Sequence, residues 1–352
     1  MSIKYLDKNS RKLDILFIDE GFSNLKIKGA TYKVINNKKK NFYLIYQALL
    51  SFFFEKKNLT LKEIYLKKIL EFYQPKIVIG HNFNHWIYET KKIYPETISI
   101  AYLHNRLYLD QINYLKKNYK NKVVDYFFVC DDLHKKKLSK FIKSKFIANG
   151  LTKNNEIEVS KTKLKRYDLM VISEFRNLSK NHFYSKCFEY VVRLIANYAE
   201  IYNLKVLVAL NSSRIEKKKI NRYKEIQYFK RIYPKFYFNH NNSYQNAELS
   251  KVSVCLASNL GADLLARGSK VLFLPLLEKY SQKYKTMYLK SKSYYICKKK
   301  DKKEIFKKIN VMMKLKKTRW NKILLKSKDK FIFDKQNKII KKLISNIINN
   351  VN

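Results

Sequence analysis

The stretch from Ser243 to Leu274 reads SYQNAELSKVSVCLASNLGADLLARGSKVLFL, and it decides the expected fold. The apolar run Val252–Leu256 is typical of a strand that is covered on both faces of a parallel sheet. A helix is expected next, because Ser258 is a favoured N-cap residue and Gly268 a favoured residue just past a helix end. A second apolar run follows over 270–274. The spacing therefore predicts a strand–helix–strand crossover that joins two parallel strands.

Candidate chemistry lies at the carboxyl end of the first of these strands. Ser258 and Asn259 offer polar side chains there, and the backbone N–H groups around Leu260 are at the positive end of the helix dipole. Gly261 is expected to leave room for a ligand to approach the backbone. This arrangement predicts an anion-binding site, although an ordinary capped helix has the same spacing.

Length and charge limit the possible classes of protein. The chain has 352 residues, 46% of them hydrophobic, which is enough for about two domains with sizeable cores. Its formal net charge of +47 is typical of proteins that bind nucleic acid or an anionic membrane surface. The charge is spread along the whole chain, together with many Asn, Ile, Tyr and Phe residues. We therefore favour compositional drift combined with affinity for a membrane surface, and expect no nucleic-acid partner.

No sequence feature indicates export or a membrane span. The N-terminal residues are polar and charged, no apolar run approaches about 20 residues, and the four cysteines form no CxxC pair. We expect a cytoplasmic protein with peripheral contact to the inner face of the membrane.

The order of the expected elements indicates two α/β domains. Short apolar strands alternate with helices over 1–152, and the same pattern restarts over 166–300. The polar segment 153–165 is expected to be a linker, and 301–352 to form basic helices. The predicted fold has two Rossmann-like parallel-sheet domains facing a cleft, with a helical C-terminal tail that closes the second domain or packs back onto the first.

Polar residues follow most of the expected strands. Parallel sheets bring the loops after their strands to one edge, where ligands of open α/β sheets bind. Arginines and helix N-termini suit a diphosphate, and carboxylates suit sugar hydroxyls or acid–base chemistry, so together they fit a nucleotide-sugar. These residues are Asp19, His81 and His104 in the first half and Ser173, Glu174, Arg176, Asn211, Ser213, Arg214, Ser258, Asn259 and Asp263 in the second.

Several common catalytic motifs are absent. The sequence contains no Walker phosphate loop and no GxGxxG, HExxH, GxSxG or DxD pattern. His81 and His85 have a spacing that could suit zinc, but no third ligand lies near them in the sequence, and Asp131 and Asp132 are adjacent and expected to face opposite sides. We expect no bound metal or cofactor, with the nucleotide-sugar donor acting as substrate.

At three places the chain resembles GT-B glycosyltransferases. These are Val171–Arg176, Asn211–Arg214 and Ser258–Val271, the last of which is similar to the pattern STLGYEALARGKKV. That pattern belongs to a group of bacterial O-antigen and surface-carbohydrate biosynthesis proteins, distantly akin to retaining β-Kdo transferase domains. The segments 75–82 and 149–151 match the layout of this group loosely.

The resemblance implies a metal-independent transferase that moves a sugar from a nucleotide-activated donor to a glycan or lipid-linked acceptor during O-antigen or capsule synthesis. It implies that Glu174 acts in the donor site or in acid–base catalysis and that Asp19, His81 or His104 engages the acceptor. Its donor-binding set is Ser173, Arg176, Asn211, Ser213, Arg214, Ser258, Asn259, Leu260, Gly261 and Asp263.

Three departures from the group's pattern keep other functions open. Asn259 replaces a Thr, Asp263 replaces a Glu and is one methylene shorter, and His81 stands where the group has an acidic residue. A GT-B-like protein of a glycan pathway that has lost turnover is therefore one alternative. A basic nucleic-acid-binding protein is the other, and it would bind nucleic acid with a steep dependence on salt.

Overall fold

The computed structural model divides the chain into two compact units. The first combines 1–106, 112–156 and 334–352, and the second combines 107–111 and 157–333. The residues that the structure describes are 12–20, 25, 27, 29–35, 42–54, 59–160, 164–176, 182–211, 219–239, 241–279, 285–286, 293–327 and 330–350.

A six-stranded sheet with every pair parallel forms the centre of the first unit. Its order is β2-β1-β3-β4-β5-β6. The neighbours of β1 are thus β2 on one side and β3 on the other, so the direction of winding reverses between β1 and β3. The strands are β1 (Ile15–Phe17), β2 (Tyr32–Val34), β3 (Ile77–His81), β4 (Ile98–Tyr102), β5 (Val123–Val129) and β6 (Lys143–Ala148).

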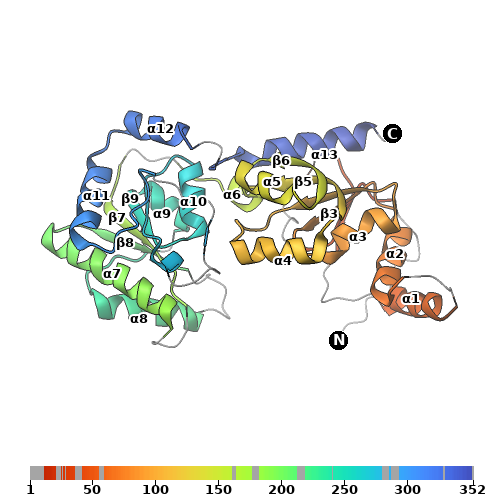
Figure 1. Cartoon of the computed structure of the whole chain (residues 1–352), viewed down its shortest axis with the longest axis horizontal. Coiled ribbons are helices and arrows are strands. Elements are labelled where there is room, and N and C mark those ends of the chain that lie inside the picture. Colours follow the sequence, from red (N-terminus) through yellow and green to blue (C-terminus); the bar gives the residue numbers. More distant parts are fainter. Residues whose placement is uncertain are drawn as a thin grey trace. The chain divides into compact units, whose positions relative to one another are not determined.

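Helices connect and cover these strands (Figure 1). The side chain of Ile87 in α3 lies over Gly80 of β3, where an added Cβ would be 3.3 Å from it, so α3 packs tightly on one face of the sheet. The helices of this half are α1 (Phe42–Phe54), α2 (Leu61–Tyr73), α3 (His85–Ile93), α4 (Leu109–Tyr119), α5 (Asp132–Leu138) and α6 (Thr152–Glu156).

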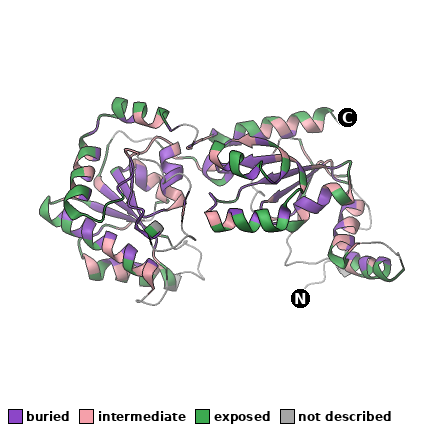
Figure 2. Ribbon diagram, viewed as in Figure 1, coloured by how far each residue is buried: buried purple, intermediate pink, exposed green. Residues whose placement is uncertain are grey.

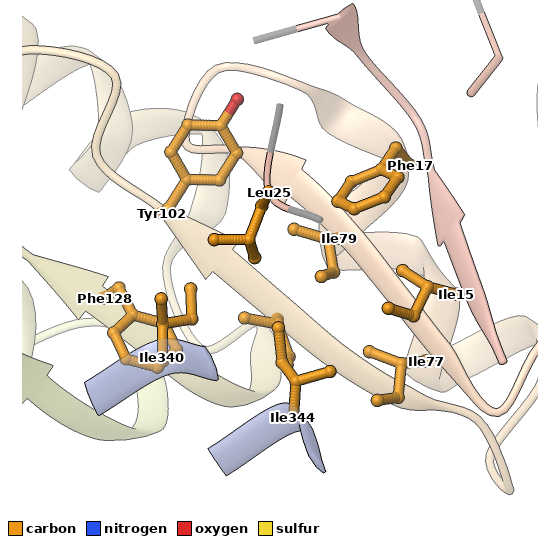
Figure 3. Packing of buried hydrophobic residues seen from close by; sticks show 10 residues of the cluster. Ile15, Phe17, Leu25, Ile77, Ile79, Tyr102, Phe128, Ile340 and Ile344 are labelled. Carbon is orange, nitrogen blue, oxygen red and sulfur yellow. The ribbon is translucent and has the colours of Figure 1, made fainter. Parts of the chain in front are cut away.

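The last helix of the chain, α13 (Lys338–Asn350), covers the opposite face of this sheet. Ile340 and Ile344 are fully buried against alternate residues of the strands (Figure 3). The strand residues in this core are Ile15, Phe17, Ile77, Ile79, Ile100, Tyr102 and Phe128. Successive side chains of a strand point to opposite faces of the sheet, so these alternate residues all lie on one face. Helix α13 therefore completes the core on that face of the first unit's sheet.

The second unit contains a four-stranded parallel sheet in the order β10-β9-β7-β8. Here the winding reverses between β7 and β9. The strands are β7 (Tyr167–Ile172), β8 (Val206–Ala209), β9 (Ser250–Cys255) and β10 (Val271–Phe273). The helices are α7 (Phe183–Ile201), α8 (Lys219–Ile232), α9 (Ser243–Glu248), α10 (Asn259–Ala266), α11 (Lys302–Lys314) and α12 (Lys317–Leu325), with a 3-10 turn, η3 (Leu276–Lys279).

The predicted fold class is confirmed: both sheets are parallel and carry the interleaved helices of Rossmann-like domains. The strand–helix–strand unit predicted from 243–274 is present as β9, α10 and β10. The predicted cleft between the domains stays a prediction.

The division into units differs from the predicted one at two places. The segment predicted as a linker, 153–165, begins inside α6, which belongs to the first unit. Asn155 and Asn337 hold this helix to the short 3-10 turn η5 (Lys335–Asn337) by a 2.9 Å side-chain hydrogen bond. The predicted C-terminal segment 301–352 is split, because α11 and α12 lie in the second unit and α13 in the first.

Candidate functional site

The candidate donor site lies where the winding of the second sheet reverses. Loops after β7 and β9 emerge there side by side at the carboxyl edge, the place where open α/β sheets bind their ligands. Ser173, Glu174 and Arg176 follow β7, and the N-terminus of α10 follows β9.

Glu174 joins these two loops. One carboxylate oxygen accepts hydrogen bonds from the backbone N–H groups of Leu256 at 2.7 Å and Ala257 at 3.1 Å. The other accepts the Tyr184 hydroxyl at 2.9 Å. Burial raises the pKa of Glu174, while the hydroxyl, the two amides and Arg176 act to lower it. The side chain is only 8% exposed, so Glu174 holds the start of α10 in place rather than presenting a free carboxylate.

Arg176 presents the exposed positive charge at this edge. Its guanidinium lies 4.0 Å from the centre of the Tyr184 ring, a cation–π arrangement. Tyr184 therefore supports Arg176 with its ring and Glu174 with its hydroxyl. The charge is exposed, as binding a ligand phosphate would require.

The beginning of α10 is capped as predicted. Ser258 accepts the Leu260 N–H at 3.3 Å. Within the described part of the chain, the buried Oδ1 of Asn259 has no hydrogen-bond partner. This oxygen can accept a hydrogen bond from a ligand hydroxyl or amide beside the helix N-terminus.

The expectation that Gly261 leaves room for a ligand near the backbone was wrong. A Cβ at this position would lie 2.7 Å from Cys255 Sγ and 2.9 Å from the ring of Phe273. The missing side chain thus faces β9 and β10 and not a ligand. Gly261 is needed because α10 packs directly on the sheet.

The remaining predicted donor-site residues have different surroundings. Asp263, in the second turn of α10, is buried and accepts the Tyr244 hydroxyl at 3.2 Å. Asn211 is exposed, and its amide nitrogen donates to the Phe175 carbonyl at 3.2 Å. Ser173 is buried, and its hydroxyl accepts the Phe175 N–H at 3.2 Å. Ser213 and Arg214 lie outside the described residues.

The first unit has a matching arrangement between β1 and β3. Asp19, which follows β1, accepts the His81 N–H at 2.7 Å and the Tyr102 hydroxyl at 2.7 Å. His81 Nδ1 accepts the Phe83 N–H at 3.0 Å, so in the neutral ring the proton is on Nε2. The His104 ring lies 6.2 Å from the His81 ring, and burial together with His81 lowers its pKa.

Both units therefore use a carboxylate in the same way. Asp19 accepts the Tyr102 hydroxyl and a backbone N–H of the neighbouring strand β3. Glu174 accepts the Tyr184 hydroxyl and backbone N–H groups of the loop after the neighbouring strand β9. Tyr102 and Tyr184 complete these arrangements, and sequence reasoning missed both, because tyrosine is common throughout this chain and neither lies in a recognisable motif.

A third cluster, also missed, is buried at the carboxyl end of β5. Cys130, Asp131 and His134 place three ligand-type atoms within 4.8 Å of one another. Arg106 donates to Asp131 at 2.5 Å, and His134 Nδ1 lies 2.7 Å from the other oxygen. Burial raises the pKa of Asp131, but His134 and Arg106 together lower it to about 2. The guanidinium already compensates the carboxylate charge, so this cluster acts as a buried ion pair.

The fold is that of GT-B-type enzymes, as comparison with solved structures shows. The UDP-GlcNAc 2-epimerase of Methanocaldococcus jannaschii, solved with UDP-GlcNAc and UDP, matches with a TM-score of 0.52 and 12% identity, over 95% of this chain and 99% of that one. HepE of Anabaena, solved with UDP and glucose, matches with a TM-score of 0.52 and 10% identity, over 95% and 100%. The chain spans 62% of the pneumococcal O-GlcNAc transferase GtfA, with a TM-score of 0.49 and 12% identity. No family model and no curated protein matches the sequence.

Proposed function

We propose that this chain is a glycosyltransferase that transfers a sugar from a nucleotide-activated donor, a UDP-sugar, in bacterial surface polysaccharide synthesis. The observation that carries the proposal is the carboxyl edge between β7 and β9. An exposed arginine, a helix N-terminus and the unpartnered oxygen of Asn259 are available there, next to a loop that a buried glutamate holds in place. Structures with the same fold contain UDP, in agreement with this donor.

In the proposed mechanism, the donor diphosphate binds the first turn of α10 and Arg176. Charge develops on the leaving diphosphate as the bond to the anomeric carbon breaks, and both groups stabilise that charge without a metal. Glu174 is a positioning residue, since its oxygens are occupied by amides and a hydroxyl of the protein.

The Asp19–His81 pair is the candidate acceptor site. When the new C–O bond forms, the acceptor hydroxyl must lose a proton. Neutral His81 uses Nδ1 for the Phe83 N–H and would donate a hydrogen bond to the acceptor oxygen from Nε2. The neighbouring His104, whose pKa burial lowers, is the candidate base. Asp19 accepts the His81 backbone N–H and thereby fixes the backbone of that residue. A glycan or a lipid-linked sugar would supply the hydroxyl.

Binding of UDP tests the donor site. UDP at about 100 times its dissociation constant should stabilise the protein by about 2.7 kcal/mol, which thermal unfolding can detect. Arg176→Ala should weaken UDP binding by about tenfold or more, because it removes a charge-assisted contact to phosphate. Arg193→Ala is the matched control, since Arg193 pairs with Glu189 on the exposed side of α7. The donor site is rejected if neither UDP nor another nucleoside mono- or diphosphate shifts the melting temperature.

Epimerisation of the donor sugar is the second candidate, favoured by the match to a UDP-GlcNAc 2-epimerase over nearly the whole of both chains. Product analysis separates the two activities. A transferase releases UDP only when an acceptor is present, whereas an epimerase changes the sugar configuration without one. UDP binding with neither reaction would indicate the non-catalytic alternative.

A further inference from the structure

Helix α1 has an unusual composition and an unusual degree of exposure. Its sequence, FYLIYQALLSFFF, contains no charged residue. Among residues 43–54, whose burial the structure describes, Leu44, Ala48 and Ser51 are the buried ones. Helix α1 packs against α2. Much of the helix is exposed (Figure 2), and its exposed side chains are large and apolar or aromatic.

The exposed surface of α1 is mainly aromatic. Phe53 is 76% exposed and Phe54 81%, and the other exposed large side chains are Tyr43, Tyr46, Leu49, Leu50 and Phe52. A single exposed phenylalanine is ordinary, but seven large apolar side chains on one short helix form a continuous patch of the kind that marks an interaction surface.

We propose that α1 is the membrane-docking element of this protein and that it inserts into the interface of an anionic phospholipid bilayer. Its 13 residues extend about 20 Å, which is too short for a hydrocarbon core about 30 Å thick, so it would lie in the plane of the interface. Exposed phenylalanine and leucine side chains suit the acyl boundary, and Tyr43 and Tyr46 suit the headgroup level.

Charge identifies the partner as an anionic surface. Lys38, Lys39 and Lys40 come just before α1 in the sequence, and Lys56 and Lys57 just after it, with one glutamate between the helix and the second group. Lysines that flank an apolar helix in the sequence are attracted to the negative surface potential of an anionic membrane. A second copy of a chain with a net charge of +47 would instead be repelled, so self-association through this patch is disfavoured.

The inference does not depend on the proposed sugar transfer. Within the described residues, no helix combines the length and apolar character needed to span a bilayer. Docking through α1 would hold the enzyme at the surface where a lipid-linked acceptor is found.

Flotation of the full-length protein with vesicles tests the inference. Vesicles of phosphatidylethanolamine and phosphatidylglycerol should carry the wild-type protein to the top of the gradient, and phosphatidylcholine vesicles should carry much less. The double variant F53S/F54S should bind anionic vesicles at least about tenfold more weakly, because two rings no longer enter the interface. Both side chains are exposed, so folding should be unaffected, which circular dichroism and the melting temperature can verify.

The matched control is Y223S/L325S, which removes two side chains of the second unit that are each 65% exposed. Unchanged binding of this control together with weak binding of F53S/F54S supports docking through α1. Equal binding of wild type and F53S/F54S overturns the inference, because the lysines alone then account for attachment. Sedimentation velocity gives a second check: a wild-type dimer that F53S/F54S converts to a monomer would also overturn it, since the patch would then bind a second copy.

Discussion

At the scale of single residues, both sheets have a carboxylate that accepts backbone hydrogen bonds at the point where the winding reverses. Each carboxylate accepts backbone hydrogen bonds from the other side of the point where the winding reverses. Asp19 accepts the N–H of His81, and Glu174 accepts those of Leu256 and Ala257. A carboxylate used in this way fixes the loops that carry ligand-binding groups, which is a condition for a preorganised site. The sequence predicted that these acids lie at the carboxyl edge, but it could not show that their oxygens are occupied by the protein itself.

Replacing Gly261 by alanine tests the packing of α10. The added Cβ would collide with Cys255 Sγ and the Phe273 ring, so α10 has to move away from the sheet. We expect a loss of about 1–3 kcal/mol in the free energy of unfolding and weaker UDP binding, because the helix N-terminus shifts. Urea denaturation and UDP titration measure these effects. The second substitution Cys255→Ala should restore part of the loss, since it removes one of the colliding groups. A stable G261A variant with normal UDP affinity would contradict the packing argument.

At the scale of elements, local sequence signals determine α2 well. The helical period of its apolar residues predicts a helix over 61–73, and the structure has this helix at Leu61–Tyr73. Thr60 and Glu63 form a capping box, in which Glu63 accepts the Thr60 N–H at 2.7 Å and Thr60 accepts the Glu63 N–H at 3.3 Å. Lys92 adds an ion pair to Glu63 at 2.8 Å. Burial raises the pKa of Glu63, but these contacts lower it to about 2.

The stability that Glu63 contributes should therefore depend on pH. Its pKa is lower in the folded protein than the ordinary value of 4.5, so the contribution is complete above that value and is lost as pH falls toward 2. Glu63→Gln should cost about 1 kcal/mol at neutral pH, and the difference from wild type should disappear in acid. Urea denaturation at a series of pH values measures this. Glu71→Gln removes a carboxylate that is 38% exposed in its ion pairs with Lys67 and Lys68, and should differ from wild type by less than about 0.5 kcal/mol throughout.

Elements without such local signals were missed. Strand β2 is three residues long and lies at the sheet edge with two of its residues exposed, so it shows no apolar alternation. Helix α6 consists of polar residues, and three of them are buried because their partners come from elsewhere, including the turn at 334–337. The short apolar segments 235–238 and 293–296 predict strands, but in the structure they make isolated bridges at Tyr237 and Ile296. An element could be predicted from the sequence where its apolar residues recur at a regular spacing and its ends carry capping residues. Total hydrophobicity was a weaker guide.

At the scale of the whole molecule, the chain leaves the first unit and returns to it. The chain leaves the first unit after Glu156 and re-enters it at Asp334. Hydrogen bonds within the first unit join these two places, because Asn155 accepts the Asp334 N–H at 3.1 Å and donates to Asn337. The sequence left open whether the terminal helices pack on the second domain or the first. The tertiary structure identifies the sheet that covers α13, because Ile340 and Ile344 of this helix lie in the core of the first unit.

The return of α13 makes the stability of the first unit depend on the last residues of the chain. Ile344 is fully buried against β1, β3 and β4, whereas Ile339 of the same helix is 44% exposed. Ile344→Ala should lower the free energy of unfolding by about 2–4 kcal/mol, because it removes buried methylenes and leaves a cavity. Ile339→Ala, with the same change of side chain in the same helix, should cost less than about 0.5 kcal/mol. Urea denaturation measures both, and limited proteolysis of I344A should cleave the first unit before the second. Equal effects of the two substitutions would mean that α13 is not part of this core, and the first sheet would then need another cover for the face that carries Ile15, Ile77 and Ile79.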